Sequence, residues 1–392
     1  MKDILLKYRP YCWPSLFFLW TIALFSSRAL LSISYGIMAV SVLTEVFYLQ
    51  IKYRITGVNI AILSFFGIFL ISSTWSEHPL QALSFLTVKL PFLVIGLLVG
   101  NTGISEKATE KIRQLFILLI VVSATYTLTV YLSDISYWKM AYTRGTVLPT
   151  VLHHSVYSMM VVWAMLFLFQ QRRKHPLIVA VLLAYLFIFL HLLAVKTGLL
   201  CLYIGIVLLI FSQLNKKTTL YSIPLLLAIG ILLNYSTTIK HKIDYLKYDL
   251  QRINQADVFD YSDARRLISM KMAVEIVQEH PVFGVGIGDV HEAIKQQYIR
   301  HYQQYDREKM MFPHNTYLHI ACAAGIVGLI IATCLFIYLF RWIKNQLYRI
   351  SFCLLLLVCC WDALLEQQVG VALLLWLIVQ YDNSRQLTKQ HG

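Results

Sequence analysis

Long apolar runs dominate this sequence and limit what the chain can fold into. The 392 residues are 58% hydrophobic and only 14% charged, which leaves too little polar surface for a water-soluble domain of this size. Apolar runs of about 17–25 residues are long enough to cross a bilayer as helices, and open sheets or irregular coil cannot face lipid. The sequence therefore predicts an all-α, polytopic membrane protein.

The hydropathy pattern predicts about twelve transmembrane helices. The expected spans lie near residues 12–27, 29–49, 57–75, 81–99, 113–133, 152–170, 176–194, 197–213, 218–235, 315–340, 347–361 and 363–381. We expect one integrated domain in three stretches. These are the first nine helices over 1–235, a helical loop domain over 236–313, and the last three helices with a tail over 314–392.

The basic residues indicate which side of the membrane each loop faces. Lys and Arg crowd one alternating set of loops, for example 107–113, 172–174 and 341–349. The short loops of the other set hold only Arg28, Lys139, Arg144 and Lys196. Because cytoplasmic loops carry the excess of basic residues, both termini are expected in the cytoplasm. The net charge of +14 is then a topology signal and does not indicate nucleic-acid binding.

The segment 236–313 is the one long stretch without a membrane-length apolar run, and the topology places it outside. It holds equal numbers of acidic and basic residues. Ser262 or Asp263 could cap a helix whose apolar residues recur at helical spacing until Pro281 ends it. GVGIGD, residues 284–289, predicts a turn, and a polar amphipathic helix should follow it. We expect a small helical cap, a kind of loop that often carries function.

Ionisable residues near the outer ends of the spans are the functional candidates, because such groups are costly at membrane depth. His314 has a side chain suited to general base catalysis near neutrality, and it could equally donate a hydrogen bond to a phosphate. Arg265 and Arg266 open the cap helix, and guanidinium groups bind phosphate in bidentate fashion. Lys196 is either an anion-binding cation or an amine that reaches the membrane surface. The alternatives without a functional role are a solvated pair for Arg265 and Arg266 and an imidazole at the membrane interface for His314.

Four further residues are tentative substrate-binding members of the same site. They are His154, Arg144, Asn315 and Glu366. A group of cations and histidines on one face favours a negatively charged, lipid-anchored substrate. The sequence has neither a DxD-like carboxylate motif outside nor Walker glycines, so we expect no metal and no other cofactor.

Four segments of the chain resemble those of a known family. RLISMKMAVEIVQEHPVFGVGIGD, followed by PHNTYLHIACAAGIVG, resembles the signature region of the O-antigen ligase and polymerase superfamily over residues 266–328. AVKTGLL resembles an upstream family motif, with Lys196 where arginine is usual, which keeps the charge and loses the bidentate fork. LLEQQVG, which contains Glu366, resembles a C-terminal pattern of some members.

The resemblance implies a metal-independent, inverting glycosyltransferase of GT-C-like architecture in the bacterial inner membrane, with its active site at the periplasmic face. The donor would be a glycan on undecaprenyl diphosphate, and in the ligases the acceptor is lipid A–core. The resemblance makes His314 the leading catalytic candidate, and Arg266 with Lys196 the diphosphate binders. The expected partners are these two substrates and membrane lipids, with no nucleic acid.

Two alternatives stay open at the level of sequence. An O-antigen polymerase or a protein O-oligosaccharyltransferase shares the motifs and differs in its acceptor. A transporter or flippase belongs to another class and should show a two-fold repeat or paired discontinuous helices. Neither feature is evident in the sequence, which disfavours a transporter. The motif spacing and the short loop between spans five and six resemble those of ligases more, so a ligase is favoured over a polymerase or oligosaccharyltransferase.

Overall fold

The computed structural model describes residues 2–143, 146–212, 262–302 and 310–388, and every regular element within these ranges is a helix. The span predicted at 218–235 lies outside the described residues. The other predicted spans all fall on helices, of which 6 in the described ranges are long and apolar enough to cross a membrane. The prediction of a polytopic helical membrane protein is therefore confirmed, and the count of about twelve spans stays a prediction.

The N-terminal helices follow the predicted apolar runs. They are α1 (Lys2–Ser26), α2 (Arg28–Leu43), α3 (Gly57–Ser72), α4 (Pro79–Lys89), α5 (Pro91–Leu98), α6 (Glu106–Ser133), α7 (Ile135–Thr143), α8 (His154–Gln170), α9 (Pro176–Leu193) and α10 (Lys196–Ser212). Pro91 starts α5 and separates it from α4, because proline fits a first helical turn better than a helix interior. Ser27 ends α1 and caps α2 by accepting a hydrogen bond from the Leu30 N–H at 3.1 Å.

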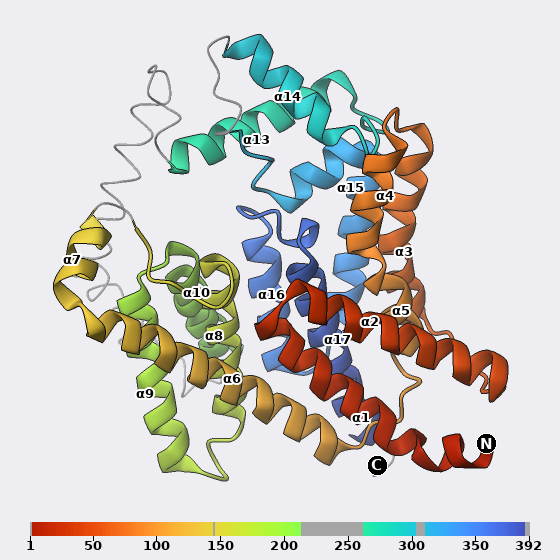
Figure 1. Cartoon of the computed structure of the whole chain (residues 1–392), viewed down its shortest axis with the longest axis vertical. Coiled ribbons are helices and arrows are strands. Elements are labelled where there is room, and N and C mark those ends of the chain that lie inside the picture. Colours follow the sequence, from red (N-terminus) through yellow and green to blue (C-terminus); the bar gives the residue numbers. More distant parts are fainter. Residues whose placement is uncertain (1, 144–145, 213–261, 303–309, 389–392) are drawn as a thin grey trace.

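The C-terminal part supplies the cap and the centre of the bundle. Its helices are α13 (Ser262–Glu279), α14 (Val290–His301), α15 (Thr316–Trp342), α16 (Gln346–Val358) and α17 (Gln368–Thr388). Both helices predicted in the loop are present, and Figure 1 shows α13 and α14 lying across the upper end of α15. Residues 370–383 of α17 are all buried, as expected for a helix that is apolar on nearly every side.

The glycines of the two signature segments lock the cap onto α15. Gly325 has a φ of 66° and breaks the helix. The backbone groups released there pair with the segment that precedes α14, since Val285 N–H donates to Cys322 O and Ile326 N–H donates to Pro281 O, both at 2.8 Å. Gly325 therefore admits the cap segment and does not lie on a regular helix, although it falls within the predicted span 315–340.

Gly284 and Gly328, the other two glycines near this contact, have different surroundings. A Cβ at Gly284, whose φ is +67°, would lie 2.3 Å from Cys322 O, so this position also needs glycine. Gly328 faces Ile68 of α3, whose Cγ2 would lie 3.4 Å from an added Cβ. Gly328 thus lies on the side of α15 that packs against α3, and an added Cβ would also meet Ala324 Cβ of the same helix.

We expect Gly325→Ala to undock the cap. The added Cβ would lie 2.1 Å from Val282 O, and a positive φ at a non-glycine residue costs about 1–3 kcal/mol before any clash is counted. Limited proteolysis in detergent should then cleave α13 or α14 faster and the melting temperature should fall. Gly67→Ala, which meets no atom within 4 Å, is the matched control. Equal protease resistance in the two variants would show that this docking contributes little.

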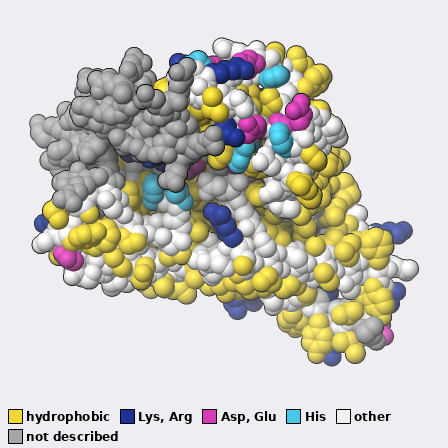
Figure 2. All heavy atoms as spheres, turned by 45° about the horizontal axis from the view of Figure 1, so that its top comes forward, with side chains coloured by type: hydrophobic (Ala, Val, Ile, Leu, Met, Phe, Trp, Pro, Cys, Tyr) yellow, Lys and Arg dark blue, Asp and Glu magenta, His cyan; other side chains and the backbone are white. Residues whose placement is uncertain are grey.

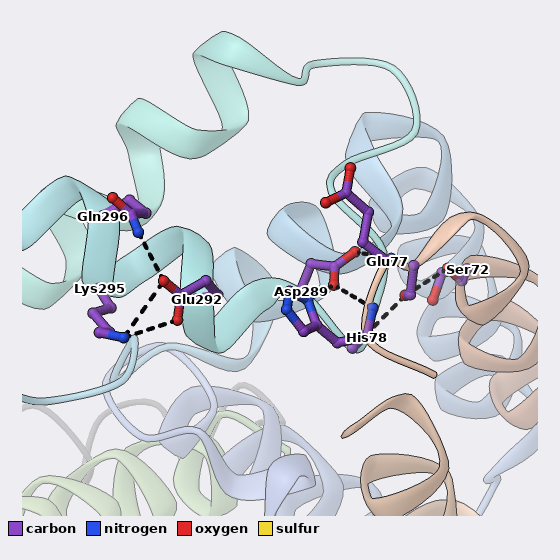
Figure 3. Close-up of polar contacts among 9 residues, drawn as sticks. Ser72, Glu77, His78, Asp289, Glu292, Lys295 and Gln296 are labelled. Carbon is purple, nitrogen blue, oxygen red and sulfur yellow. Dashed lines mark hydrogen bonds and ion pairs between the residues drawn. The ribbon is translucent and has the colours of Figure 1, made fainter. Parts of the chain in front are cut away.

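A carboxylate fixes the other side of the cap to the turn between α3 and α4. Asp289 accepts hydrogen bonds from the N–H groups of Glu77 at 2.7 Å and His78 at 3.0 Å, and His78 Nδ1 lies 2.6 Å from it (Figure 3). Gly288 N–H also donates to Ser76 Oγ at 3.0 Å. The cap therefore contacts both α15 and the start of α4, the helix that ends at Lys89.

Candidate active site

The loop between α16 and α17 packs directly on the first turn of α15. Asn315 Nδ2 donates to Cys360 O at 2.7 Å, and Thr316 Oγ1 donates to Asp362 O at 3.0 Å. These bonds hold the HN segment of α15 against a loop that carries two carboxylates, Asp362 and Glu366. The start of α15 and the α16–α17 loop, which are distant in sequence, thus form one packed unit.

Asn315 has a structural role in this unit. Its Oδ1 accepts from Leu318 N–H at 2.9 Å and caps α15, while its Nδ2 is held by Cys360 O. Both ends of the amide are therefore engaged by the protein. These bonds give Asn315 a positioning role beside His314, and its tentative assignment to substrate binding stays a prediction.

Asp362 lies between two histidines. Its Oδ1 is 3.9 Å from His314 Nδ1 and its Oδ2 is 3.9 Å from His153 Nδ1. The Asp362 side chain is only 4% exposed, whereas that of His314 is 21% exposed. Burial raises the pKa of Asp362, and the nearby charges of His153 and Arg266 oppose that rise. The buried carboxylate thus shares its surroundings with cationic groups.

The two arginines of α13 act on the same group. Burial, together with the charges of Arg266, His153 and Arg265, lowers the pKa of His314 to about 4. Within the described ranges, Nε of both arginines and Nδ1 of His314 are buried without a hydrogen-bond partner. Each such buried polar group costs about 1–3 kcal/mol unless something satisfies it. Unsatisfied donors from two elements therefore converge where an anionic ligand could accept from them.

The surface above this unit is strongly polar. Figure 2 shows Lys and Arg, His, and Asp and Glu side chains gathered on the upper part of this face, whereas hydrophobic side chains cover the lower part. This separation is what a membrane protein requires, since the apolar band faces lipid and the charged end faces water.

The remaining predicted residues differ in how they are placed. Arg144 lies outside the described residues. The ring of His154 lies 4.2 Å from the ring of His153, centroid to centroid, so His154 adjoins the site through its neighbour. Lys196 begins α10, and two residues later Gly198 packs on Ser158 of α8, where an added Cβ would lie 2.4 Å from the Ser158 Cβ. Lys196 and His154 therefore lie at the same end of this helix pair.

A comparison with protein families agrees with the resemblance described above. Residues 180–333 match the family model described as O-Antigen ligase. The match, which spans less than half of the chain, supports a relationship to the O-antigen ligase-like superfamily. The matched O-antigen ligase region contains Lys196, Arg265, Arg266 and His314, whereas His153 and Asp362 lie outside it. No curated protein sequence matches the chain.

Glu366 belongs to a second, largely buried group of ionisable side chains next to α15. Its Oε2 lies 2.9 Å from Lys89 Nζ and its Oε1 lies 3.3 Å from His319 Nδ1. Lys89 Nζ also donates to Leu365 O. Glu366 therefore pairs with the buried lysine of α4, and its tentative role in substrate binding stays a prediction. The contacts of Lys89 with Glu366 and Leu365 therefore fix the α16–α17 loop to α4.

Sequence reasoning counted His153 and Asp362 among the ionisable candidates but left them out of the predicted site, and it missed His319. Nothing in the spacing showed that His153 and Asp362 face His314. His319 lies inside the apolar run of α15, and its contact with Glu366 depends on how α15 packs against the α16–α17 loop. The signal for His153 and His319 is a titratable residue inside a predicted span, whereas Asp362 lies between two predicted spans.

Proposed function

We propose that this protein is an O-antigen ligase that transfers a glycan from undecaprenyl diphosphate to lipid A–core at the periplasmic face of the bacterial inner membrane. The observation that carries the proposal is the convergence of His314, Asp362, Arg265 and Arg266 at the start of α15. A site for a diphosphate leaving group needs fixed cations, and a site for a hydroxyl nucleophile needs a base. This arrangement supplies both.

The cations hold the donor. Arg266 and Arg265, with Lys196 from α10, bind the diphosphate oxygens and stabilise the negative charge that grows on them as the glycan leaves. Guanidinium groups suit this task because they present paired donors and stay charged at all relevant pH values. The buried Nε atoms of both arginines are then satisfied by the substrate.

The acceptor hydroxyl supplies the new bond. Its oxygen attacks the anomeric carbon on the face opposite the diphosphate, and the carbon–oxygen bond to the diphosphate breaks with its electron pair leaving on the diphosphate. The hydroxyl proton passes to His314, so the anomeric configuration is inverted. Asp362 faces the Nδ1 side of the imidazole at 3.9 Å, which leaves Nε2 as the proton acceptor.

The pH dependence of transfer should report the base. His314 must be neutral to accept a proton, and its pKa of about 4 in the free protein keeps it neutral at pH 7. We expect kcat/KM to be level near neutrality and to fall as pH drops toward 4, in a transfer assay between pH 4 and 8. The acid limb of kcat should lie at a higher pH, because the bound diphosphate offsets the charge of Arg266. A kcat/KM that rises as the pH falls toward 4, or that does not fall there, would contradict the assignment.

Arg266→Ala is expected to lower transfer by roughly 10²–10³-fold, the usual loss when a donor to a developing negative charge is removed. Arg266→Lys keeps the charge without the paired donors and should retain an intermediate rate. Initial rates with purified protein measure the effect. Lys271→Ala, on the same helix at an exposed position, is the control and should be unchanged. Equal rates for the two alanine variants would remove Arg266 from the site.

One assay separates the proposal from its alternatives. Purified protein is mixed with undecaprenyl-diphosphate-linked glycan and lipid A–core, and the products are separated on a gel. A glycan attached to lipid A–core supports the ligase. A donor glycan that only grows longer would indicate a polymerase, and a glycan attached to a protein acceptor would indicate an oligosaccharyltransferase. No transfer to any acceptor would contradict the proposed enzyme.

A further inference from the structure

A pocket of about 240 Å³ lies beside the candidate site, between the α1–α2 turn, the segment that precedes α8 and the start of α17. Its polar lining comes from Ser26, Ser27, Arg28, His153 and Gln367. The volume is smaller than the roughly 300–1,000 Å³ of pockets for drug-sized ligands. The pocket therefore suits a single sugar unit better than an oligosaccharide or a lipid tail.

The pocket meets the candidate site at Asp362. His153 Nδ1 lies 3.9 Å from Asp362 Oδ2, and Gln367 Nε2 donates to Asp362 Oδ1 at 3.5 Å. That same Oδ1 lies 3.9 Å from His314 Nδ1. Two residues that line the pocket thus contact the carboxylate that lies beside the proposed base. A ligand in the pocket would therefore be separated from Asp362 by His153 or Gln367.

The pocket and the arginines come from different parts of the fold. Arg265 and Arg266 belong to α13 in the cap, whereas the pocket is built by α1, α2 and the segment before α8. A displacement with inversion requires the nucleophile and the leaving group on opposite sides of the anomeric carbon. If the arginines hold the leaving diphosphate, the pocket is left for the sugar that carries the nucleophile.

Arg28 indicates the chemistry of that sugar. The residue is exposed at the pocket, and it forms no ion pair within the described ranges. A neutral sugar needs hydrogen-bonding groups such as His153 and Gln367 but no cation, whereas a guanidinium group binds a phosphate or carboxylate group in bidentate fashion. An acceptor with an anionic substituent fits both features.

We propose that this pocket binds the terminal acceptor sugar, and that Arg28 selects an acceptor whose saccharide carries a phosphate or carboxylate group. The proposal rests on the proposed transferase function. It assigns His153 and Gln367 to the acceptor side of the site and the arginines of α13 to the donor side.

Binding measurements without turnover test this assignment. Two probes are deacylated lipid A–core saccharide with its phosphates and the same saccharide after dephosphorylation, and a third is undecaprenyl diphosphate. Isothermal titration calorimetry should show that Arg28→Ala weakens binding of the phosphorylated saccharide by roughly tenfold or more. Binding of undecaprenyl diphosphate should be unchanged. Lys139→Ala, at an exposed position of α7, is the matched control and should leave all three affinities unchanged.

The outcomes distinguish the two proposals. Equal affinity of wild type and Arg28→Ala for the phosphorylated saccharide, or no preference of wild type for it over the dephosphorylated one, would overturn the role of Arg28. Weaker binding of undecaprenyl diphosphate to Arg28→Ala would assign the pocket to the donor and overturn the acceptor assignment. Saccharide binding that depends on Arg28, in a protein that transfers no glycan, would contradict the transferase function alone.

Discussion

Replacing His314 with alanine is expected to lower glycan transfer by roughly 10²–10⁴-fold, the usual contribution of a positioned general base. The imidazole lies beside Asp362, and Arg266 and Arg265 are close enough to lower its pKa. Alanine leaves the hydroxyl proton without an acceptor other than water. The assay is the purified transfer reaction with saturating donor and acceptor, read as kcat.

The fold should survive this substitution. His314 precedes α15, and its Nδ1 makes no hydrogen bond within the described ranges, so alanine removes no structural bond there. His280→Ala, at an exposed position in the cap, is the control and should retain full activity. A His314→Ala protein that melts normally and transfers glycan at the wild-type rate would eliminate histidine from the mechanism. His314→Gln separates the roles, because it can donate to a phosphate but cannot accept the proton.

Lys89→Met is expected to destabilise the protein by about 3–5 kcal/mol, the usual cost of leaving one member of a buried ion pair without its partner. The Lys89 side chain is 0% exposed and that of Glu366 is 10% exposed. The substitution also removes the hydrogen bond to Leu365 O. Thermal unfolding in detergent should show a markedly lower melting temperature. Transfer should fall as well, because the α16–α17 loop carries Asp362.

A second substitution shows whether the charge is the cause. Lys89→Met combined with Glu366→Gln removes both charges and should recover much of the lost stability, since a neutral pair leaves no uncompensated charge. Lys174→Met breaks the exposed pair with Glu110, whose atoms lie 3.2 Å apart, and should change stability by less than about 1 kcal/mol. If Lys89→Met melts like Lys174→Met, the buried pair does not hold the loop.

The helices were predictable from sequence because lipid dictates their length and apolar character. The two cap helices were also predictable, from the stop at Pro281 and the turn at 284–289. The break at Gly325 was not, because a glycine in an apolar run is compatible with a close helix contact and with a left-handed kink. Only the backbone of the docked cap segment decides between these two conformations.

The candidate site was predictable in its parts and not in its pairings. His314 and Arg266 stood out as polar residues beside apolar runs, and the family motifs marked them. The contacts of Asp362 with His314 and of Glu366 with Lys89 join residues separated by 48 and 277 positions. Such contacts depend on tertiary packing, which periodicity along one helix does not encode.

For the proposed transfer, the residues at the start of α8, α10 and α13 must lie together at the periplasmic face. Cysteines at positions 153, 196 and 267, in a background without the exposed Cys12 and Cys334, can be labelled with a membrane-impermeant maleimide in intact spheroplasts. We expect all three to react from outside, and a cysteine at position 173 to react only after permeabilisation. Reaction of any of the three only after permeabilisation would place the site residues on opposite sides of the membrane and contradict the account.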